Sequence, residues 1–225
     1  MTSSLQRYTA EFIGTFILVA IGPGAVMVAA STDAFGHLGV ALAFGLAVTL
    51  VVAGTGSIGG AHINPAVTLG LWSTRRFPRR DVLPYVLAQC AGAVAASFTS
   101  GWLLGAVANF GATVPALSTP RAFVIEAGYS AILGLVIVGV AGSAAAPFAV
   151  GATVFAGALV TGPLTGGSFN PARSFGPAVA GGVWSAHWLY WMAPILGVCG
   201  GMWLGELLRK TTTTQRSGND AGSQS

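Results

Sequence analysis

Long apolar stretches separated by short polar links make up most of this chain. Six of these stretches are long enough to cross a hydrocarbon layer about 30 Å thick as helices, which takes roughly 20 residues each. They lie at residues 8–30, 37–58, 82–107, 121–143, 147–164 and 187–208. This pattern predicts an all-α membrane protein with six transmembrane helices.

Two shorter apolar pieces follow the second and the fifth of these spans. The first contains Asn64-Pro65-Ala66 and the second contains Asn170-Pro171-Ala172. Asn is a favourable N-cap, and Pro is tolerated in the first helical turn because its missing N–H would be unpaired there anyway. We therefore expect two re-entrant half-helices, 65–73 and 171–180, each too short to cross the membrane.

The chain also repeats itself. Glu11 opens the first span and Glu126 the fourth, and each is followed by a similar run of small and apolar residues. Each half, about 8–107 and 121–208, contains three spans and one half-helix. Because three is an odd number, the two halves must insert with opposite orientations. The half-helices should then enter from opposite faces and meet with their N-termini near the midplane, an arrangement that builds transport sites.

Composition supports a location in the membrane. Hydrophobic residues make up 53% of the 225 residues and charged residues only 7%, whereas soluble domains carry roughly 25% charged residues. Most of the surface therefore does not face water. We place a single transmembrane domain at residues 1–210 and expect a disordered tail at 211–225, where polar residues dominate.

The basic residues indicate the orientation in the membrane. Eight of the ten lie at Arg7, at four arginines between positions 75 and 80, and at three residues between 209 and 216. With six spans these places share one side, which the positive-inside rule makes cytoplasmic, together with both termini. The net charge of +4 thus reflects orientation rather than nucleic-acid binding. An aromatic belt is predicted at one end of the last span, from Trp184, Trp188, Tyr190 and Trp191.

The half-helices predict the chemistry of the site. Each N-terminus carries roughly half a positive charge and unpaired N–H groups. A passing water oxygen can accept one hydrogen bond from Asn64 and one from Asn170. This turns its hydrogens away from neighbouring waters and interrupts a proton wire, while the two dipoles disfavour cations.

Arg173 lies on the first turn of the second half-helix. Facing lipid it would cost at least about 2.5–3.5 kcal/mol, so we expect it to face an aqueous path and to oppose cations there. The alternative is a structural ion pair with Glu126 or Glu11.

Four polar residues in apolar surroundings are predicted to support the loops before the half-helices: Glu11, Glu126, Gln89 and His62. We expect the carboxylates to accept hydrogen bonds from the unwound backbone and His62 to make one hydrogen bond to the backbone. The alternatives are proton coupling by the glutamates in a carrier, pH sensing by His62 and substrate contact by Gln89.

The sequence offers no catalytic or metal centre. Asp33, Asp81 and Asp220 lie outside the spans, and the histidines do not cluster, so neither a nucleophile–base pair nor a metal site is predicted. Cys90 and Cys199 are interpreted as core residues. An ion-coupled carrier normally needs a titratable or cation-binding group at the midplane, whereas two neutral amides are expected there. We therefore predict a passive channel with no cofactor, and not a carrier or an enzyme.

These motifs closely resemble the aquaporin (major intrinsic protein) family. The resemblance rests on four features: the doubled Asn-Pro-Ala, the extension Asn-Pro-Ala-Arg-Ser-Phe-Gly-Pro from Asn170, the stretch Ser-Ile-Gly-Gly-Ala-His-Ile before Asn64, and the paired glutamates. The likeness runs from about Glu11 to Glu206. It implies six full spans and two half-spans in a homotetramer of independent pores for water.

In that family four positions form the narrowest part of the pore, and the motif spacing carries them onto Phe44, Ala158, Gly167 and Arg173. Phe44 and Arg173 resemble water-selective members. Ala158 departs from them, because strict water channels usually place His there, and Gly167 is also small. The resemblance thus implies a widened, less polar filter that could admit ammonia, urea, hydrogen peroxide or glycerol.

Ser174 and Ala178 resemble water channels, since glycerol channels typically carry Asp and a basic residue just after the second motif. We therefore expect a water channel in the lipid bilayer that also passes small neutral solutes. The alternatives are a glycerol channel, or an ammonia or urea channel with water secondary. The short loops and compact length favour a bacterial inner membrane.

Overall fold

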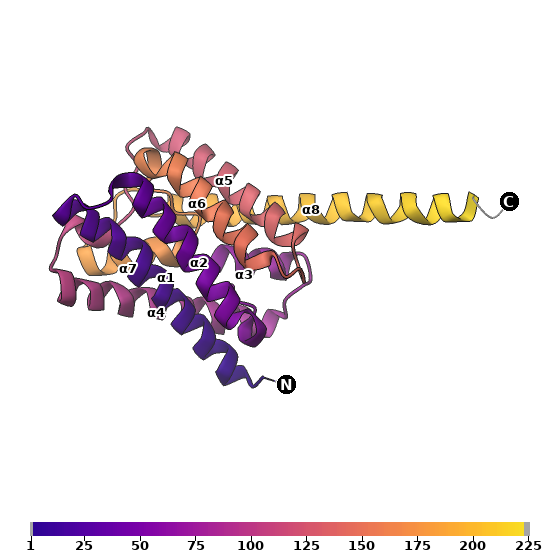
Figure 1. The fold of residues 1–225 in the computed structure, drawn as a ribbon, viewed down its shortest axis with the longest axis horizontal. Coiled ribbons are helices and arrows are strands. Elements are labelled where there is room, and N and C mark those ends of the chain that lie inside the picture. The colour runs from indigo at the N-terminus through magenta and orange to yellow at the C-terminus, as the bar shows by residue number, and fades with distance from the viewer. Residues whose placement is uncertain (1, 223–225) are drawn as a thin grey trace.

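The computed structural model describes the backbone of residues 2–222 and the side chains of residues 2–209. These residues form helices and no strands, as the apolar pattern predicts. Six helices are long and apolar enough to cross a membrane (Figure 1). They are α1 (Ser4–Thr32), α2 (Gly36–Gly59), α4 (Arg79–Leu104), α5 (Thr119–Gly139), α6 (Ala146–Thr165) and α8 (Leu189–Gly222).

Two short helices and one turn complete the fold. The short helices are α3 (Pro65–Ser73) and α7 (Pro171–Gly181), and they agree with the half-helices predicted at 65–73 and 171–180. The turn η1 (Ala108–Gly111) lies in the link between α4 and α5 and is not indicated by the sequence pattern. The third span was expected to reach residue 107, but α4 ends at Leu104 because Gly105 has a φ of 84°.

The last helix, α8, continues past the bundle to Gly222 and projects away from it (Figure 1). The sequence predicts a disordered tail at 211–225, and over 211–222 the structure differs from this prediction. A helix that has already formed can add residues without a new nucleation step, which accounts for its continuation through a polar segment. Residues 223–225 lie outside the described residues.

The two halves of the chain pack in the same way. α1 contacts α4 and α2, and α5 contacts α8 and α6 in the equivalent arrangement, while α2 and α6 join the halves. Close helix crossings recur at matching positions. A Cβ atom at Gly92 would lie 2.3 Å from the carbonyl oxygen of Phe12, and one at Gly197 would lie 2.2 Å from that of Ala127. Small residues let these helix backbones touch, which is how helices associate in lipid.

We expect Gly197→Ala to destabilise the bundle, because its Cβ would overlap the backbone of α5 rather than a flexible side chain. Overpacking of this kind costs about 1–3 kcal/mol. The matched control is Gly200→Ala on the same helix, where a Cβ would meet nothing within 4 Å. Thermal unfolding in detergent should show a lower midpoint for the first variant alone, and equal midpoints would contradict the close crossing.

Most of the basic side chains that the structure describes lie at one end of the bundle, here called the arginine-rich end, and the opposite end is the arginine-poor end. At the start of α1, Arg7 forms an ion pair of 3.0 Å with Asp81 at the start of α4. Tyr8 donates a hydrogen bond of 2.7 Å to the same carboxylate. These contacts hold the start of α1 against the start of α4.

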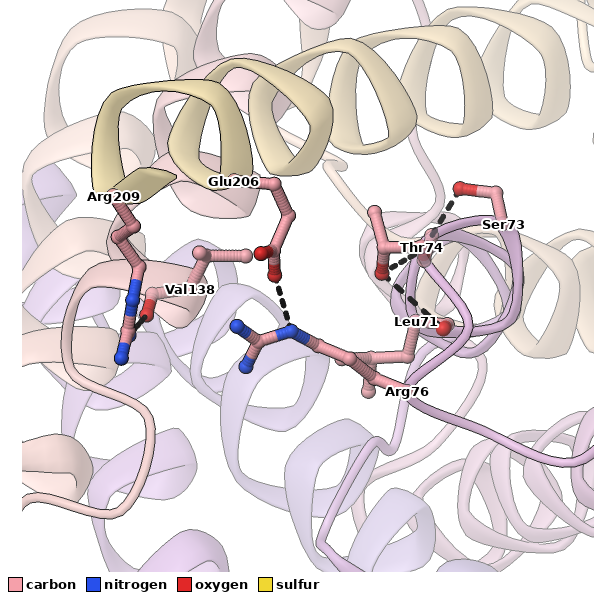
Figure 2. A network of polar contacts seen from close by, with 8 residues as sticks. Leu71, Ser73, Thr74, Arg76, Val138, Glu206 and Arg209 are labelled. Atoms are coloured by element: carbon pink, nitrogen blue, oxygen red, sulfur yellow. Dashed lines mark hydrogen bonds and ion pairs between the residues drawn. The ribbon is translucent and has the colours of Figure 1, made fainter. Parts of the chain in front are cut away.

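Figure 2 shows a second set of contacts at this end. Arg76, just after α3, forms an ion pair with Glu206 of α8. Arg209 of α8 donates a hydrogen bond of 2.7 Å to the carbonyl of Val138 at the end of α5. The link after α3, the end of α5 and the part of α8 near Arg209 therefore meet, so Arg76 and Arg209, two of the basic residues predicted to share one side of the membrane, share one end of the bundle.

Candidate functional site

The half-helices α3 and α7 meet through their N-termini. Asn64 caps α3, with its side-chain oxygen accepting a hydrogen bond of 2.8 Å from the backbone N–H of Ala66. Asn170 caps α7 in the same way, accepting 3.0 Å from the N–H of Ala172. Pro65 and Pro171 occupy the first helical position, where no N–H is needed. The two Asn-Pro-Ala motifs therefore form two equivalent helix starts.

Each asparagine also reaches across to the opposite half-helix. Asn64 Nδ2 donates a hydrogen bond of 2.8 Å to the carbonyl of Phe169, and Asn170 Nδ2 donates one of 2.8 Å to the carbonyl of Ile63. An amide nitrogen carries two hydrogens, so each side chain keeps one further donor. Both asparagines line the same cavity, and these two donors are available to a molecule inside it.

The cavity has a volume of about 810 Å³ and extends from the link between α5 and α6 to the region of Arg173. Its walls are largely aliphatic, with Leu18, Val48, Val67 and Leu133 among the lining residues. The backbone segments 60–64 and 167–170 contribute a polar strip along it. Apolar walls with a few convergent polar groups are typical of a solute path.

The two loops before the half-helices have the same unusual backbone. Positive φ angles occur at Gly60 (89°), Ala61 (48°) and Ile63 (44°), and at the matching Gly166 (86°), Gly167 (57°) and Phe169 (53°). Left-handed backbone is unfavourable for residues with a Cβ, so its recurrence in both halves indicates a function. Within the described residues, no protein donor reaches the carbonyls of Gly60, Ala61, His62, Gly167 or Ser168. These residues line the cavity, and their carbonyls can accept hydrogen bonds from water.

Two buried glutamates hold these loops. Glu11 accepts hydrogen bonds from the backbone N–H groups of His62 (2.8 Å) and Ile63 (2.6 Å). Gln89 Nε2 donates a third, of 2.8 Å, to the same carboxylate. Glu11 is fully buried and is not among the cavity-lining residues, so the geometry agrees with loop support rather than with proton coupling.

Glu126 has the equivalent position in the second half. It accepts hydrogen bonds from the N–H groups of Ser168 (3.0 Å) and Phe169 (3.0 Å) and from the hydroxyl of Thr165 (2.6 Å). Pro194 stands where Gln89 stands in the first repeat, and Thr165 supplies the third donor in its place.

His62 also supports its loop, but through a partner that differs from the expected one. Its Nδ1 lies 3.1 Å from the hydroxyl of Thr68, so the predicted hydrogen bond to the backbone is wrong. Thr68 donates its single hydrogen to the carbonyl of Asn64 and accepts from Gln89. The tautomer with its proton on Nδ1 is the one in which all three contacts of Thr68 are hydrogen bonds. The side chain of Thr68 is within reach of the imidazole because it points back along α3 toward the loop.

Arg173 is held by a carbonyl and an aromatic ring. Its Nη1 donates a hydrogen bond of 2.8 Å to the carbonyl of Gly111 in η1, and its guanidinium carbon lies 4.7 Å from the ring centre of Phe44. In the described part of the chain Arg173 forms no ion pair with Glu126 or Glu11, the alternative considered from the sequence. Its Nε has no hydrogen-bond partner among the side chains and backbone that the structure describes, and Arg173 lines the cavity.

The remaining two filter positions lie beside each other. A Cβ atom at Gly167 would be 3.5 Å from the Cα of Ala158. Phe44, Gly167 and Arg173 line the cavity, whereas Ala158 is not among the lining residues and is buried in an apolar cluster with Phe44. The methyl side chain of Ala158 is too short to project into the path.

Three polar contacts of the site were not foreseen from the sequence. Tyr85 donates a hydrogen bond to the carbonyl of Gly59 (2.7 Å), and Tyr190 donates to that of Thr165 (2.6 Å). Tyr190 is fully buried, so its prediction as part of an interfacial belt is wrong. The matching positions of the two tyrosines in the repeat could have shown this, because a residue that repeats with the loops has the same partner in each half.

The third unforeseen contact joins the α4–α5 link to the second loop. The hydroxyl of Thr113 donates to Ser174 (2.9 Å), which lies 2.6 Å from the hydroxyl of Ser168. No group of three or more metal-ligating side chains occurs in the described residues.

Comparisons with known proteins agree with this architecture. The family model described as "Major intrinsic protein" matches residues 1–204. Aquaporin NIP1-1 of Zea mays is 41% identical over 221 residues, which are 94% of this chain and 78% of that protein. Probable aquaporin AqpM of Archaeoglobus fulgidus is 40% identical over 247 residues, covering 93% of this chain and all of that one (100%). The solved structure of the aquaglyceroporin from Plasmodium falciparum superimposes with a TM-score of 0.80 at 25% identity, over 91% of this chain and 95% of that one.

Proposed function

The chain belongs to the major intrinsic protein family, and we propose how its residues select among solutes. It is an integral membrane channel for water and small solutes, and not an enzyme. The further proposal is that Asn64 and Asn170 form the central constriction, and that Phe44, Ala158, Gly167 and Arg173 form a second one nearer the arginine-poor end.

One observation supports the central constriction above all. Asn64 and Asn170 exchange reciprocal hydrogen bonds of 2.8 Å with the opposite loops and keep one donor each beside the cavity. A water oxygen that accepts from both cannot accept a proton from the next water in the file. The N-termini of α3 and α7 add positive potential at the same point, which opposes cations without affecting neutral molecules.

The second constriction supports passage of small neutral solutes besides water. Beside Phe44 and Arg173, Gly167 lines the cavity without a side chain, and the neighbouring Ala158 does not reach the cavity. Ammonia, urea, hydrogen peroxide and glycerol are the candidate solutes. A channel mainly for glycerol, or for ammonia or urea, is the second candidate, and the resemblance to a protein titled aquaglyceroporin favours testing glycerol first.

Osmotic shrinkage of proteoliposomes tests the function as a passive channel. Stopped-flow light scattering should show fast water flux with a low activation energy and no dependence on ion gradients. The same vesicles are then challenged with urea, glycerol and ammonia. Flux that requires a proton or sodium gradient would overturn the proposal in favour of a carrier.

We predict that Ala158→His narrows the filter, because an imidazole on α6 would add bulk beside Gly167, which lines the cavity. Glycerol and urea flux should fall by about tenfold or more while water flux stays within about twofold, since pore width discriminates by solute size. Leu159→His is the matched control, because Leu159 is 37% exposed on the outer surface. Solute rates that do not change in Ala158→His would refute the assignment of this filter position.

We also propose that the channel domain at residues 1–210 assembles as a homotetramer with both termini in the cytoplasm. The arginines at one end of the bundle support this orientation. An exposed stripe on α2, formed by Leu38, Leu42, Leu46 and Leu50, supports contact with a neighbouring subunit or lipid. Native mass spectrometry in detergent tests the tetramer.

We also propose that the protein resides in a bacterial inner membrane. The similar proteins named above come from a plant, an archaeon and a protist, so this part of the proposal rests on the short loops and compact length of the chain.

A further inference from the structure

The position of Arg173 depends on a segment far from it in sequence. The carbonyl that accepts its hydrogen bond belongs to Gly111, in the turn η1 between α4 and α5. This turn contacts α1, α4 and α7, so it is placed by three helices at the arginine-poor end. Whatever fixes η1 therefore also fixes the guanidinium beside the cavity.

The backbone of η1 is left-handed over four successive residues. The φ angles are 49° at Ala108, 49° at Asn109, 57° at Phe110 and 70° at Gly111. In this conformation the Cβ of a non-glycine residue comes too close to the following carbonyl oxygen. A run of three such residues persists only where the surroundings hold it in place.

The ring of Phe110 packs against glycines of two helices. A Cβ atom at Gly101 of α4 would lie 2.2 Å from Cε1 of this ring, and one at Gly181 of α7 would lie 3.2 Å from Cδ2. Two glycines on two helices thus form a socket for the ring, and the side chain is half-buried there. No side chain larger than hydrogen fits at Gly101 while the ring stays in place.

Gly111 is held from the other side by α1. A Cβ atom at this residue would lie 2.9 Å from Pro23, against its Cα, Cβ and carbonyl oxygen. The carbonyl of Gly111 therefore cannot shift toward α1, and the socket of Phe110 prevents the turn from relaxing toward α4 and α7. Together these contacts leave one position for the acceptor of Arg173.

We propose that Phe110 is a positioning residue that sets the selectivity of the pore by holding the acceptor of Arg173. The ring anchors the left-handed turn, the turn presents the Gly111 carbonyl, and the carbonyl keeps the guanidinium against Phe44 and out of the path. This inference rests on the proposed filter role of Arg173. When the anchor is lost, the guanidinium turns to the unpaired carbonyls beside the cavity and narrows the passage.

The test measures the ratio of glycerol to water permeability in proteoliposomes, with Phe110→Ala and the milder Phe110→Leu. We expect the ratio to fall by at least about threefold in Phe110→Ala and by less in Phe110→Leu, in line with coupling between contacting groups. Gly101→Ala should act in the same direction because it displaces the ring from its socket. The matched control is Phe98→Ala on the outer face of α4, where the side chain is 55% exposed.

The double variant Phe110→Ala, Arg173→Val separates positioning from a general structural role. Since Phe110 acts through Arg173, the double variant should have the same ratio as Arg173→Val alone, while a structural role would lower flux in both backgrounds. An unchanged or raised ratio in folded Phe110→Ala, Phe110→Leu and Gly101→Ala would overturn the inference. If Arg173→Val itself leaves selectivity unchanged, the proposed filter fails instead.

Discussion

Replacing Arg173 by valine is expected to raise proton and cation leakage through the pore by roughly a hundredfold. The estimate follows from Coulomb's law, since a unit charge about 5 Å from a passing cation opposes it by about 3 kcal/mol at an effective dielectric constant near 20. Glycerol and urea flux should rise as well, because valine lacks the guanidinium that Phe44 and Gly111 hold beside the path, and the pore is therefore wider there. Water flux should change little.

Vesicles loaded with a pH-sensitive dye and held at a fixed potential provide the measurement. Arg121→Val is the matched control, since it removes the same charge from an exposed site at the start of α5, at the same end of the bundle. Arg173→Lys keeps the charge but not the planar fork, so it should retain most of the barrier to cations and lose part of the selectivity among neutral solutes. If Arg173→Val leaks protons and cations no faster than the original protein, Arg173 does not form the proposed barrier to cations.

Much of this architecture could be predicted because the sequence encodes it locally and twice. An Asn N-cap followed by Pro predicts where α3 and α7 begin, and both begin there. The spacing of apolar residues predicts the six spans. The matching glutamates at positions 11 and 126 predict support of the unwound loops, and each carboxylate does accept two backbone N–H groups from its loop.

The surroundings of Arg173 could not be predicted in the same way. Its acceptor, Gly111, is 62 positions away in sequence and lies in a link without apolar periodicity or a repeat partner. The path of such a link depends on what the packed helices leave open, here a socket between glycines of α4 and α7. Ala158 shows the related limit of motif spacing, which locates a residue along α6 but does not tell how far its short side chain extends toward the cavity.

Replacing Glu126 by leucine is expected to prevent the second loop from keeping its shape. The backbone N–H groups of Ser168 and Phe169 would lose their acceptor, and the hydroxyl of Thr165 would keep only its longer hydrogen bond of 3.3 Å to the carbonyl of Thr161. Each buried donor left unpaired costs about 1–3 kcal/mol, so the two N–H groups together cost roughly 2–6 kcal/mol. Folded domains are typically stable by about 5–15 kcal/mol. We therefore expect a lower yield of folded protein, measured as the monodisperse fraction in detergent, and a lower thermal unfolding midpoint.

The isosteric variant Glu126→Gln distinguishes loop support from proton coupling. Its amide oxygen can replace Oε1, which accepts from Ser168 and Thr165, so only the N–H of Phe169 loses its acceptor. Loop support then predicts that Glu126→Gln loses roughly half as much stability as Glu126→Leu, with passive water flux preserved in the folded fraction. Glu11→Gln should behave in the same way, because its carboxamide oxygen also keeps two of the three donors.

Glu206→Leu is the control. It removes a partly exposed ion pair with Arg76 and should cost no more than about 1 kcal/mol of stability. Full stability of Glu126→Gln together with loss of a gradient-driven flux would instead identify the carboxyl as a proton carrier, because only a group that titrates during transport would be needed for flux and dispensable for the fold.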